Sequence, residues 1–323
     1  MKTVTPALRQ LVKILNDQQL HSGHDLSLAL QISRNAVWKH IQQLIKYGIE
    51  VESVQSSGYR LHAPLSLLNE NEIRPALHQP KIALELLGSV GSTNDFTSPL
   101  DPDQGLQFRL AEHQTQGRGR FHRPWLAPFG ANILLSCRVN LPQDLSHCGG
   151  LSLCMGLAVV AALREFGLEE LACKWPNDIL YRQQKLAGVL IELQGEAHSI
   201  THAVIGVGCN VNMSAEKLLE IERPTTSLQV ILGRVQDRNQ IAALLINYLS
   251  AYLKRFSEKG LAAFQAEWQI YDALRGQAIQ LHLGAACIQG VVTGIDALGH
   301  LLVQLPSGEI KAYSAGEVSL SPP

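Results

Sequence analysis

The sequence predicts an α+β protein built from three parts, and three observations lead to this fold class. The chain has 323 residues, which is more than a single hydrophobic core usually holds. Residues 1–65 show three helical periods followed by a strand–turn–strand pattern, and residues 273–323 show short strands separated by glycines. Residues 66–272 alternate strand-like and helix-like stretches. We therefore expect an N-terminal winged helix-turn-helix, a central mixed α/β domain with a mostly antiparallel sheet, and a C-terminal SH3-like β-barrel.

The N-terminal part is expected to hold three helices and a two-stranded wing. Apolar residues recur at helical spacing in three segments, at residues 5–16, 24–30 and 34–46. Ser33 is placed to cap the third helix, which is expected to turn Val37, Ile41, Leu44 and Ile45 toward the core. Short strands are expected at residues 49–54 and 59–61, on either side of a turn.

The exposed side of this third helix suits a nucleic acid. Its residues there are Ser33, Arg34, Asn35, Trp38 and Lys39. Residues 1–65 contain seven basic and four acidic residues, a local charge of +3, whereas the whole chain has a net charge of −1. In helix-turn-helix proteins the recognition helix enters the major groove with its N-terminal residues at base edges. We therefore expect DNA binding, with a small dimerisation or docking module as the alternative.

The other two parts are expected to contain a series of helices and strands. Helices are expected at residues 67–78, 148–166 and 238–257, the second of them almost wholly apolar and therefore buried. Strands of the central domain are expected at residues 108–112, 132–139, 189–193 and 203–207. Strands of the C-terminal domain are expected at residues 278–283, 287–295, 301–305 and 310–314.

The composition narrows the class of protein. The six cysteines include no CxxC pair, so buried reduced thiols are expected, and a metal site at residues 147, 148 and 154 is the weaker alternative. No signal peptide precedes the first helix, and the longest apolar run, at residues 151–163, is too short to span a bilayer. We expect a cytoplasmic protein that does not bind a membrane.

Two segments hold residues that are suited to chemistry. The first, residues 117–125, combines glycines with three arginines, whose guanidinium forks and backbone N–H groups suit phosphate oxygens. The second runs from Lys174 to Asp178 and is followed by Lys185, a compact positive charge where an acyl phosphate would form. Asp178 is suited to help hold a magnesium ion. Together the two segments predict a site that joins a carboxylic acid to a nucleotide.

Several short segments match a known family in the same order along the chain. They are residues 91–94, 111–114, 117–120, 129–132, 174–178, 185–188 and 206–210, together with Trp125. Through them the chain resembles, over essentially its full length, the bacterial bifunctional biotin–protein ligases and biotin-operon repressors. The resemblance implies three domains, a winged helix-turn-helix at residues 1–65, a class II-synthetase-like ligase domain at residues 66–272 and an SH3-like domain at residues 273–323.

The resemblance also implies roles for individual residues. The expected biotin-binding residues are Ser92, Thr93, Asn94, Gln114, Arg118, Gly119, Arg120, Lys185 and Gly188. The expected nucleotide-binding residues are Trp125, Lys174, Asn177 and Asn210. Arg118, Arg120 and Lys185 would carry the catalysis by stabilising charge on the carboxylate and the α-phosphate. Helix capping by Ser92 and Thr93, and a core position for Trp125, are the alternatives.

The implied reaction has two steps. The carboxylate of biotin attacks the α-phosphorus of MgATP and gives biotinyl-5′-AMP and pyrophosphate. A lysine of the biotin carboxyl carrier protein of acetyl-CoA carboxylase then takes the biotinyl group and releases AMP. Biotinyl-5′-AMP that is not consumed would act as the corepressor, since the adenylate-bound chain is expected to form a homodimer through an edge strand at residues 188–193 and to bind operator DNA.

The chain departs from the family pattern at three positions. The arginine-rich loop usually reads GRGRRGR, but Phe121 replaces an arginine here and His122 replaces a glycine. We expect the adenylate to leave the site at a different rate, and the alternative is that His122 is a surface residue without effect. Ser321 stands where a relative has arginine, which puts a nucleotide contact from the C-terminal tail in doubt. Three other functions stay open: a lipoate-type ligase, a sensor-repressor without ligase activity, and a biotin ligase whose winged helix does not bind DNA.

Overall fold

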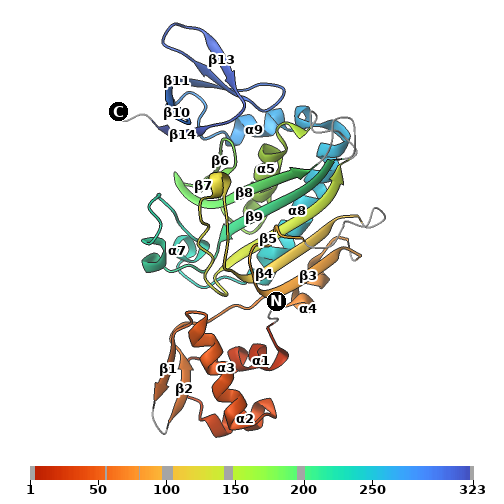
Figure 1. Cartoon of the computed structure of the whole chain (residues 1–323). Coiled ribbons are helices and arrows are strands. Elements are labelled where there is room, and N and C mark those ends of the chain that lie inside the picture. Colours follow the sequence, from red (N-terminus) through yellow and green to blue (C-terminus); the bar gives the residue numbers. More distant parts are fainter. Residues whose placement is uncertain are drawn as a thin grey trace.

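The fold has three parts that follow one another along the chain. The computed structural model describes residues 4–54, 57–79, 81–96, 105–141, 148–194 and 201–320. Figure 1 shows a helical part at the N-terminal end, a large central sheet with helices, and a small sheet at the C-terminal end. The first and last parts lie at opposite ends of the central one. The predicted α+β organisation is confirmed, whereas the residue numbers of the domain boundaries stay a prediction.

The N-terminal part is a winged helix-turn-helix. Its elements are α1 (Pro6–Leu15), α2 (Gly23–Leu30), α3 (Arg34–Lys46), β1 (Val51–Val54) and β2 (Gly58–Leu61). The side chains of Thr5, Ser22 and Ser33 each accept a hydrogen bond from the first turn of the helix that follows, so each helix begins at a local cap. Ile45 is 43% exposed, so the prediction that it faces the core is wrong, although the other three predicted residues of α3 are buried.

The central part is built on a seven-stranded sheet. In spatial order its strands are β3 (Ala83–Val90), β4 (Gln107–Gln114), β5 (Asn132–Leu141), β9 (Thr201–Asn210), β8 (Gln184–Gln194), β7 (Asp178–Tyr181) and β6 (Leu171–Lys174). Among the described strand pairs β3–β4 alone is parallel, so the predicted antiparallel character is confirmed. Residues 195–200, which join β8 to β9, lie outside the described residues.

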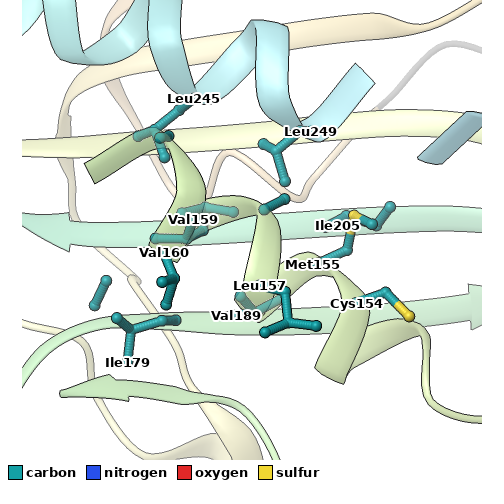
Figure 2. Packing of buried hydrophobic residues seen from close by; sticks show 14 of the residues in the cluster. Cys154, Met155, Leu157, Val159, Val160, Ile179, Val189, Ile205, Leu245 and Leu249 are labelled. Carbon is teal, nitrogen blue, oxygen red and sulfur yellow. The ribbon is translucent and has the colours of Figure 1, made fainter. Parts of the chain in front are cut away.

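Two long helices cover one face of this sheet. They are α5 (Leu151–Glu165) and α8 (Arg238–Lys259), close to the helices predicted from the sequence. Figure 2 shows side chains of both helices gathered with Val189 and Ile205 of the sheet into one buried cluster. Every second residue of β9 belongs to this core, so the residues between them, including Gly206 and Gly208, face the other side of the sheet.

The helix expected at residues 67–78 is much shorter than predicted. α4 spans Glu70–Ile73 and continues only as the 3-10 turn η1 (Arg74–Ala76). Pro75 lies in that turn, and a proline has no N–H group to continue the hydrogen bonds of an α-helix. The other short helical elements are η2 (Arg120–His122), α6 (Ala215–Leu218), α7 (Leu228–Leu232), η4 (Leu261–Phe264) and α9 (Gln265–Tyr271).

The C-terminal part is a five-stranded antiparallel sheet. In spatial order its strands are β13 (Ile310–Tyr313), β12 (Leu301–Gln304), β11 (Ala286–Ile295), β10 (Ala278–Leu283) and β14 (Glu317–Leu320). The described residues of the two edge strands, β13 and β14, do not pair with each other, so backbone hydrogen bonds leave the predicted barrel open at that point. Four of the five strands were predicted, and β14 was not.

The environment of five of the six cysteines agrees with the sequence. None of the six forms a disulfide in the described part of the chain, and the prediction of a buried thiol is wrong for Cys287, which is exposed. Burial raises the pKa of the Cys209 thiol to about 12, so it stays protonated at neutral pH. Separately, no helix in the described part of the chain is both long enough and apolar enough to cross a membrane.

A buried ion pair joins the linker to the central sheet. Arg238 Nη1 lies 2.6 Å from Glu112 Oε2, and neither side chain is exposed. The same guanidinium donates to the carbonyls of Ser66 and Asn132, and Glu112 accepts a hydrogen bond from the Leu68 N–H. The charges of Arg238 and Glu112 therefore have partners on every side. The linker, β4, β5 and α8 all meet at this ion pair.

The winged helix-turn-helix packs directly on the central part. The Tyr47 ring, at the end of α3, stacks on Phe129 with a centroid distance of 4.3 Å. Phe129 is buried in the same apolar cluster as the core of the N-terminal helices. The Asn16 side chain donates to the carbonyl of Leu65 and accepts from its N–H, and a Cβ at Gly130 would lie 2.5 Å from Leu65. The linker and the loop at residues 129–130 thus hold the first domain in place.

We expect Arg238→Met to lower the free energy of unfolding by about 3–5 kcal/mol, because it leaves the Glu112 charge buried without a partner. The measurement is denaturant unfolding followed by circular dichroism. The double variant with Glu112→Leu should recover part of the loss, since no unpaired charge remains. As a control, Arg182→Met breaks an exposed ion pair with Glu170 and should leave the midpoint unchanged. If Arg238→Met unfolds at the same denaturant concentration as the wild type, the buried ion pair does not stabilise the fold as we infer.

The interface between the domains should also respond to pH through His113. This ring lies 6.2 Å from the Tyr47 ring and its Nδ1 is 2.9 Å from Ser89 Oγ, and burial lowers its pKa. The unfolded chain therefore binds the proton more tightly, so the contribution to stability is complete above about pH 6.5 and is lost as the pH falls through the lower folded pKa. We expect the melting temperature of the wild type to fall more steeply between about pH 7 and about pH 5 than that of His113→Gln. Equal slopes in calorimetry would rule this out.

Candidate active site

The face of the central sheet opposite α5 and α8 carries most of the residues singled out by sequence. Small residues make room on this face, because a Cβ at Gly206 would lie 2.5 Å from Asn94 Oδ1. A Cβ at Gly208 would lie 2.6 Å from the Trp125 ring. The two glycines of β9 thus allow Asn94 and Trp125 to lie directly on the sheet, which places them in one site.

A cluster of neutral polar groups forms one side of the site. Because β3 and β4 are parallel neighbours, with Val90 opposite Gln114, the segment after β3 lies beside the end of β4. Gln114 Oε1 accepts hydrogen bonds from the N–H and the hydroxyl of Thr93, at 2.6 and 2.9 Å. Ser136 Oγ of β5 lies 2.7 Å from Thr93 Oγ1 and 2.6 Å from Asn94 Oδ1.

This cluster is buried and is not a helix cap. Ser92, Thr93 and Asn94 are each less than a tenth exposed, and no helix begins within residues 91–96. Their donors and acceptors therefore face one another and the sheet. The arrangement suits a compact neutral ligand that has both donors and acceptors.

The arginine-rich loop is a narrow turn that leaves β4 and returns to the sheet. The Trp125 N–H donates to the Gly117 carbonyl and the Gly119 N–H donates to the Arg123 carbonyl, both at 2.8 Å. Gly117 cannot carry a side chain here, since a Cβ would lie 2.7 Å from the Trp125 carbonyl oxygen. The loop therefore presents its arginine side chains from a closed backbone.

Carboxylates hold two of the loop arginines. Arg118 donates to both oxygens of Glu192, at 3.0 and 3.2 Å, and lies 2.9 Å from Asp95. The hydrogen bonds that Arg118 donates to Glu192 raise the pKa of Arg118 further above its usual value. On the other side of the loop Arg123 forms an ion pair with Glu317 of β14. The loop is thus attached to the central sheet at one arginine and to the C-terminal domain at another.

A lysine and an aspartate form a second charged pair beside the loop. Lys185 Nζ lies 2.6 Å from Asp178 Oδ1 and 5.3 Å from the centroid of the Trp125 ring. Asp178 of β7 pairs with Gly188 of β8, and a Cβ at Gly188 would lie 3.3 Å from Lys185 Nζ. Glycine at this position leaves space for the ammonium group. Lys174 lies opposite Asp178 at the end of β6, and burial lowers its pKa.

Two residues predicted to contact a nucleotide have structural partners. The Asn177 side chain donates to the Val189 carbonyl at 2.8 Å, and the buried Asn210 side chain donates to the Thr226 carbonyl at 3.1 Å. These amides hold the β6–β7 turn against β8 and the end of β9 against the segment that follows α6. Each side chain therefore has one amide donor bound to a backbone carbonyl of the protein.

The residues predicted to bind DNA lie far from this site, on the winged helix-turn-helix. Ser33, Arg34, Asn35, Trp38 and Lys39 are all exposed. They occupy the N-terminal half of α3, and Trp38 is 50% exposed. Arg34, Asn35 and Lys39 offer side chains of the kind that contact base edges and phosphates in the major groove.

The sequence did not point to three residues that contact the predicted site residues. Glu192, Asp95 and Ser136 were not predicted, yet they contact Arg118, Thr93 and Asn94. One signal was present, since Gly188 and Glu192 are four residues apart on a strand and therefore share a face. The segment at residues 224–226 was also missed, where the backbone of Lys185 donates to Pro224 and accepts from Thr226.

The site suits Mg²⁺ only when a ligand supplies further oxygens. Among the described residues no group of three or more His, Cys, Asp or Glu side chains is placed to hold a metal. Asp178 offers a hard carboxylate oxygen, and Mg²⁺ is usually held by one or two carboxylates together with phosphate and water oxygens. The alternative site at residues 147, 148 and 154 includes residue 147, which lies outside the described residues, as does Ser321.

Comparisons with known proteins cover all three parts of the chain. Residues 7–60 match the HTH domain family, residues 89–210 match the Biotin/lipoate A/B protein ligase family, and residues 275–321 match the Biotin protein ligase C terminal domain. The chain is 37% identical over 323 residues to the bifunctional ligase/repressor BirA of Escherichia coli, and the match covers 99% of this chain and 98% of that protein. It is 33% identical to BirA of Bacillus subtilis, over 91% of this chain and 92% of that protein.

A solved structure shares the fold of about three quarters of the chain. It is the biotin protein ligase of Aquifex aeolicus in complex with biotin and ATP, which is 30% identical to this chain. The match covers 74% of this chain and 98% of that one, with a TM-score of 0.61.

Proposed function

The chain belongs to the BirA family of bifunctional ligases and repressors, and from this premise we propose that it activates biotin with ATP and transfers it to a lysine of biotin carboxyl carrier protein. One observation carries the proposal: a neutral polar cluster, Arg118 and Lys185 lie together on one sheet face, as a neutral ring with a carboxylate tail and a triphosphate require. The individual site residues are part of the proposal.

We assign the ring of biotin to the cluster of Ser92, Thr93, Asn94 and Gln114. The ureido group of biotin has N–H donors and a carbonyl acceptor, which match the hydroxyl and amide groups there. Gly188 and Gly119 leave space for the aliphatic tail of biotin, which leads from the ring to the carboxylate. The carboxylate then reaches the cations Arg118 and Lys185, which hold it against the α-phosphate.

The first chemical step needs little from the protein beyond position and charge. The carboxylate oxygen attacks the α-phosphorus and pyrophosphate leaves, so negative charge gathers on the phosphate oxygens. Lys185 and Arg120 stabilise this charge, while Trp125 and Lys174 lie where the nucleotide extends along the sheet. Mg²⁺ held partly by Asp178 would supply further neutralisation of the phosphates. Asn177 and Asn210 contribute by holding the strands that carry these groups.

The second step transfers the biotinyl group to an amine. The amine of the carrier lysine attacks the acyl carbon, and AMP leaves with the bond electrons and a negative phosphate. The closed loop at residues 117–125 keeps water from the mixed anhydride until the carrier arrives. Since ATP and the carrier protein are cytoplasmic, we place the reaction in the cytoplasm.

The winged helix-turn-helix supports a repressor role, with biotinyl-5′-AMP as corepressor for a biotin operon. DNA contacts are assigned to the exposed residues of α3 named above. A homodimer would place two such helices on a palindromic operator. Beyond Val189, the described residues of β8 pair with β9 alone, so this edge is open to a second copy or to the carrier protein. Competition between the two partners for one edge would switch the chain between its two functions.

A lipoate-type ligase is the second candidate, because one matching family includes lipoate ligases. The N-terminal helix-turn-helix and the close similarity to BirA proteins over the full chain favour biotin. A biotin ligase with a silent DNA-binding domain would behave identically in every ligase assay. An operator gel shift with biotin and MgATP distinguishes it.

The ligase is tested by transfer of labelled biotin to a biotin carboxyl carrier domain with MgATP. We expect transfer that requires ATP and that falls by at least about 100-fold in Lys185→Ala, because one preorganised charge at a reacting centre contributes on this scale. A parallel reaction with lipoate and a lipoyl domain is the control for substrate. Labelling of the lipoyl domain alone would favour the second candidate, and labelling of neither would leave only a sensor-repressor.

The edge-strand dimer is tested by Leu193→Lys, because an edge lysine blocks strand pairing between copies. In sedimentation with biotin and MgATP we expect the wild type to dimerise and this variant to stay monomeric, with pyrophosphate release unchanged. Ile310→Lys, a similar exposed change on the C-terminal sheet, is the matched control. Loss of the dimer in both variants, or in neither, would refute the proposed edge.

A further inference from the structure

An aromatic ring stands at the tip of the arginine-rich loop. Phe121 is 60% exposed, yet its ring lies against the guanidinium of Arg120, with Arg120 Cζ 4.9 Å from the ring centroid. Phe121 and His122 both have φ of 55°, in the left-handed region that residues with side chains rarely adopt. The turn is therefore costly, and the contacts of its neighbours, including the bond between Gly119 and Arg123, must hold it.

Arg120 differs from the other two arginines of the loop. Arg118 and Arg123 are each paired with carboxylates, whereas within the described residues no carboxylate lies within ion-pair distance of Arg120. Its Nη1 donates to the neutral carbonyl of Gly316, at 3.1 Å, and Phe121 covers one face of its guanidinium. The positive charge of Arg120 is thus left for an anionic ligand.

The position of Arg120 relative to the reacting groups supports this role. Burial lowers the pKa of Arg120, while the charges of Glu317 and Asp178 act in the opposite direction, so the guanidinium lies near both the C-terminal domain and the Lys185–Asp178 pair. It therefore lies between the C-terminal domain and the side of the site assigned to the nucleotide. A small rotation of this long side chain would take it into solvent, unless something holds it.

We propose that Phe121 is a positioning residue that holds Arg120 over the nucleotide side of the site and so slows release of the acyl-adenylate. The inference rests on the proposed ligase function. A planar guanidinium stacks on an aromatic face, and this contact restricts the side chain while leaving its N–H groups free to bind a phosphate. An arginine at position 121, usual in the family, would instead place a second like charge beside Arg120.

Release of the adenylate tests the proposal directly. Labelled biotinyl-5′-AMP is formed on the full-length protein from biotin and MgATP, excess unlabelled biotin and ATP are added, and the loss of bound label is followed. We expect Phe121→Ala and Phe121→Leu to release it about 2- to 5-fold faster than the wild type, the range of an exposed cation–π contact. Phe121→Tyr and Phe121→Trp keep the aromatic face and should release it at close to the wild-type rate.

The leucine variant separates stacking from simple apolar cover, because leucine keeps apolar bulk but has no aromatic face. Equal release from the wild type and from the alanine and leucine variants, all with unchanged melting temperatures, would overturn the proposal. Wild-type-like release from leucine and fast release from tyrosine would overturn it as well. If the wild type releases no pyrophosphate and binds no labelled adenylate, the proposed function fails and the inference fails with it. Faster release from the alanine variant of an active enzyme supports both.

Discussion

The buried ion pair between Arg238 and Glu112 holds the parts of the site in one arrangement. Glu112 lies two residues before Gln114 on β4, and its backbone carbonyl accepts from Gly130. Arg238 binds the carbonyl of Asn132 at the start of β5 and that of Ser66 in the linker. A buried charge without a partner would cost several kcal/mol, so these segments cannot shift independently. The ion pair therefore fixes the position of β4, which ends at the polar cluster, and of the arginine-rich loop that follows β4.

The central sheet divides its two faces by residue size. One face packs on α5 and α8 through large apolar side chains, which Figure 2 shows, and supplies the core. The other face carries Gly188, Gly206 and Gly208, where a β-carbon would meet Lys185, Asn94 or Trp125. Since successive residues of a strand point to opposite faces, a single strand such as β9 builds both the core and the floor of the site. Stability and ligand binding are therefore separated within each strand.

Local signals in the sequence predicted local structure well. Ser33 and the spacing after it gave the whole of α3, since a cap and an apolar period are properties of a short segment. No strand was predicted at Ala83–Val90, because its leucines, glutamate and alanine do not favour a strand, and pairing with β4 decides its conformation.

The basic residues of the site were recognisable by type and order. Glu192 was not, because its contact with Arg118 joins residues 74 apart in sequence. Asn177 and Asn210 have the polarity of ligand-binding residues, and only the fold shows the carbonyls they bind.

The carboxylates around the proposed site offset the charge of its lysine and arginine side chains. Arg118 is paired with Glu192 and Asp95, Lys185 with Asp178, and Arg123 with Glu317. Clustered cations without these partners would repel one another, as half-buried Lys174 and Arg120 already do with their neighbours. An incoming carboxylate or phosphate therefore exchanges one anionic partner for another, so its net gain is a difference between two ion pairs. A phosphate has more charge and more acceptor oxygens than the carboxylate it displaces, so this exchange favours phosphate binding. An incoming carboxylate gains little binding free energy, because it replaces a group of the same kind. The carboxylate that loses its cation would then lie next to the phosphates, and there Asp178 would help hold Mg²⁺, which would neutralise part of their charge.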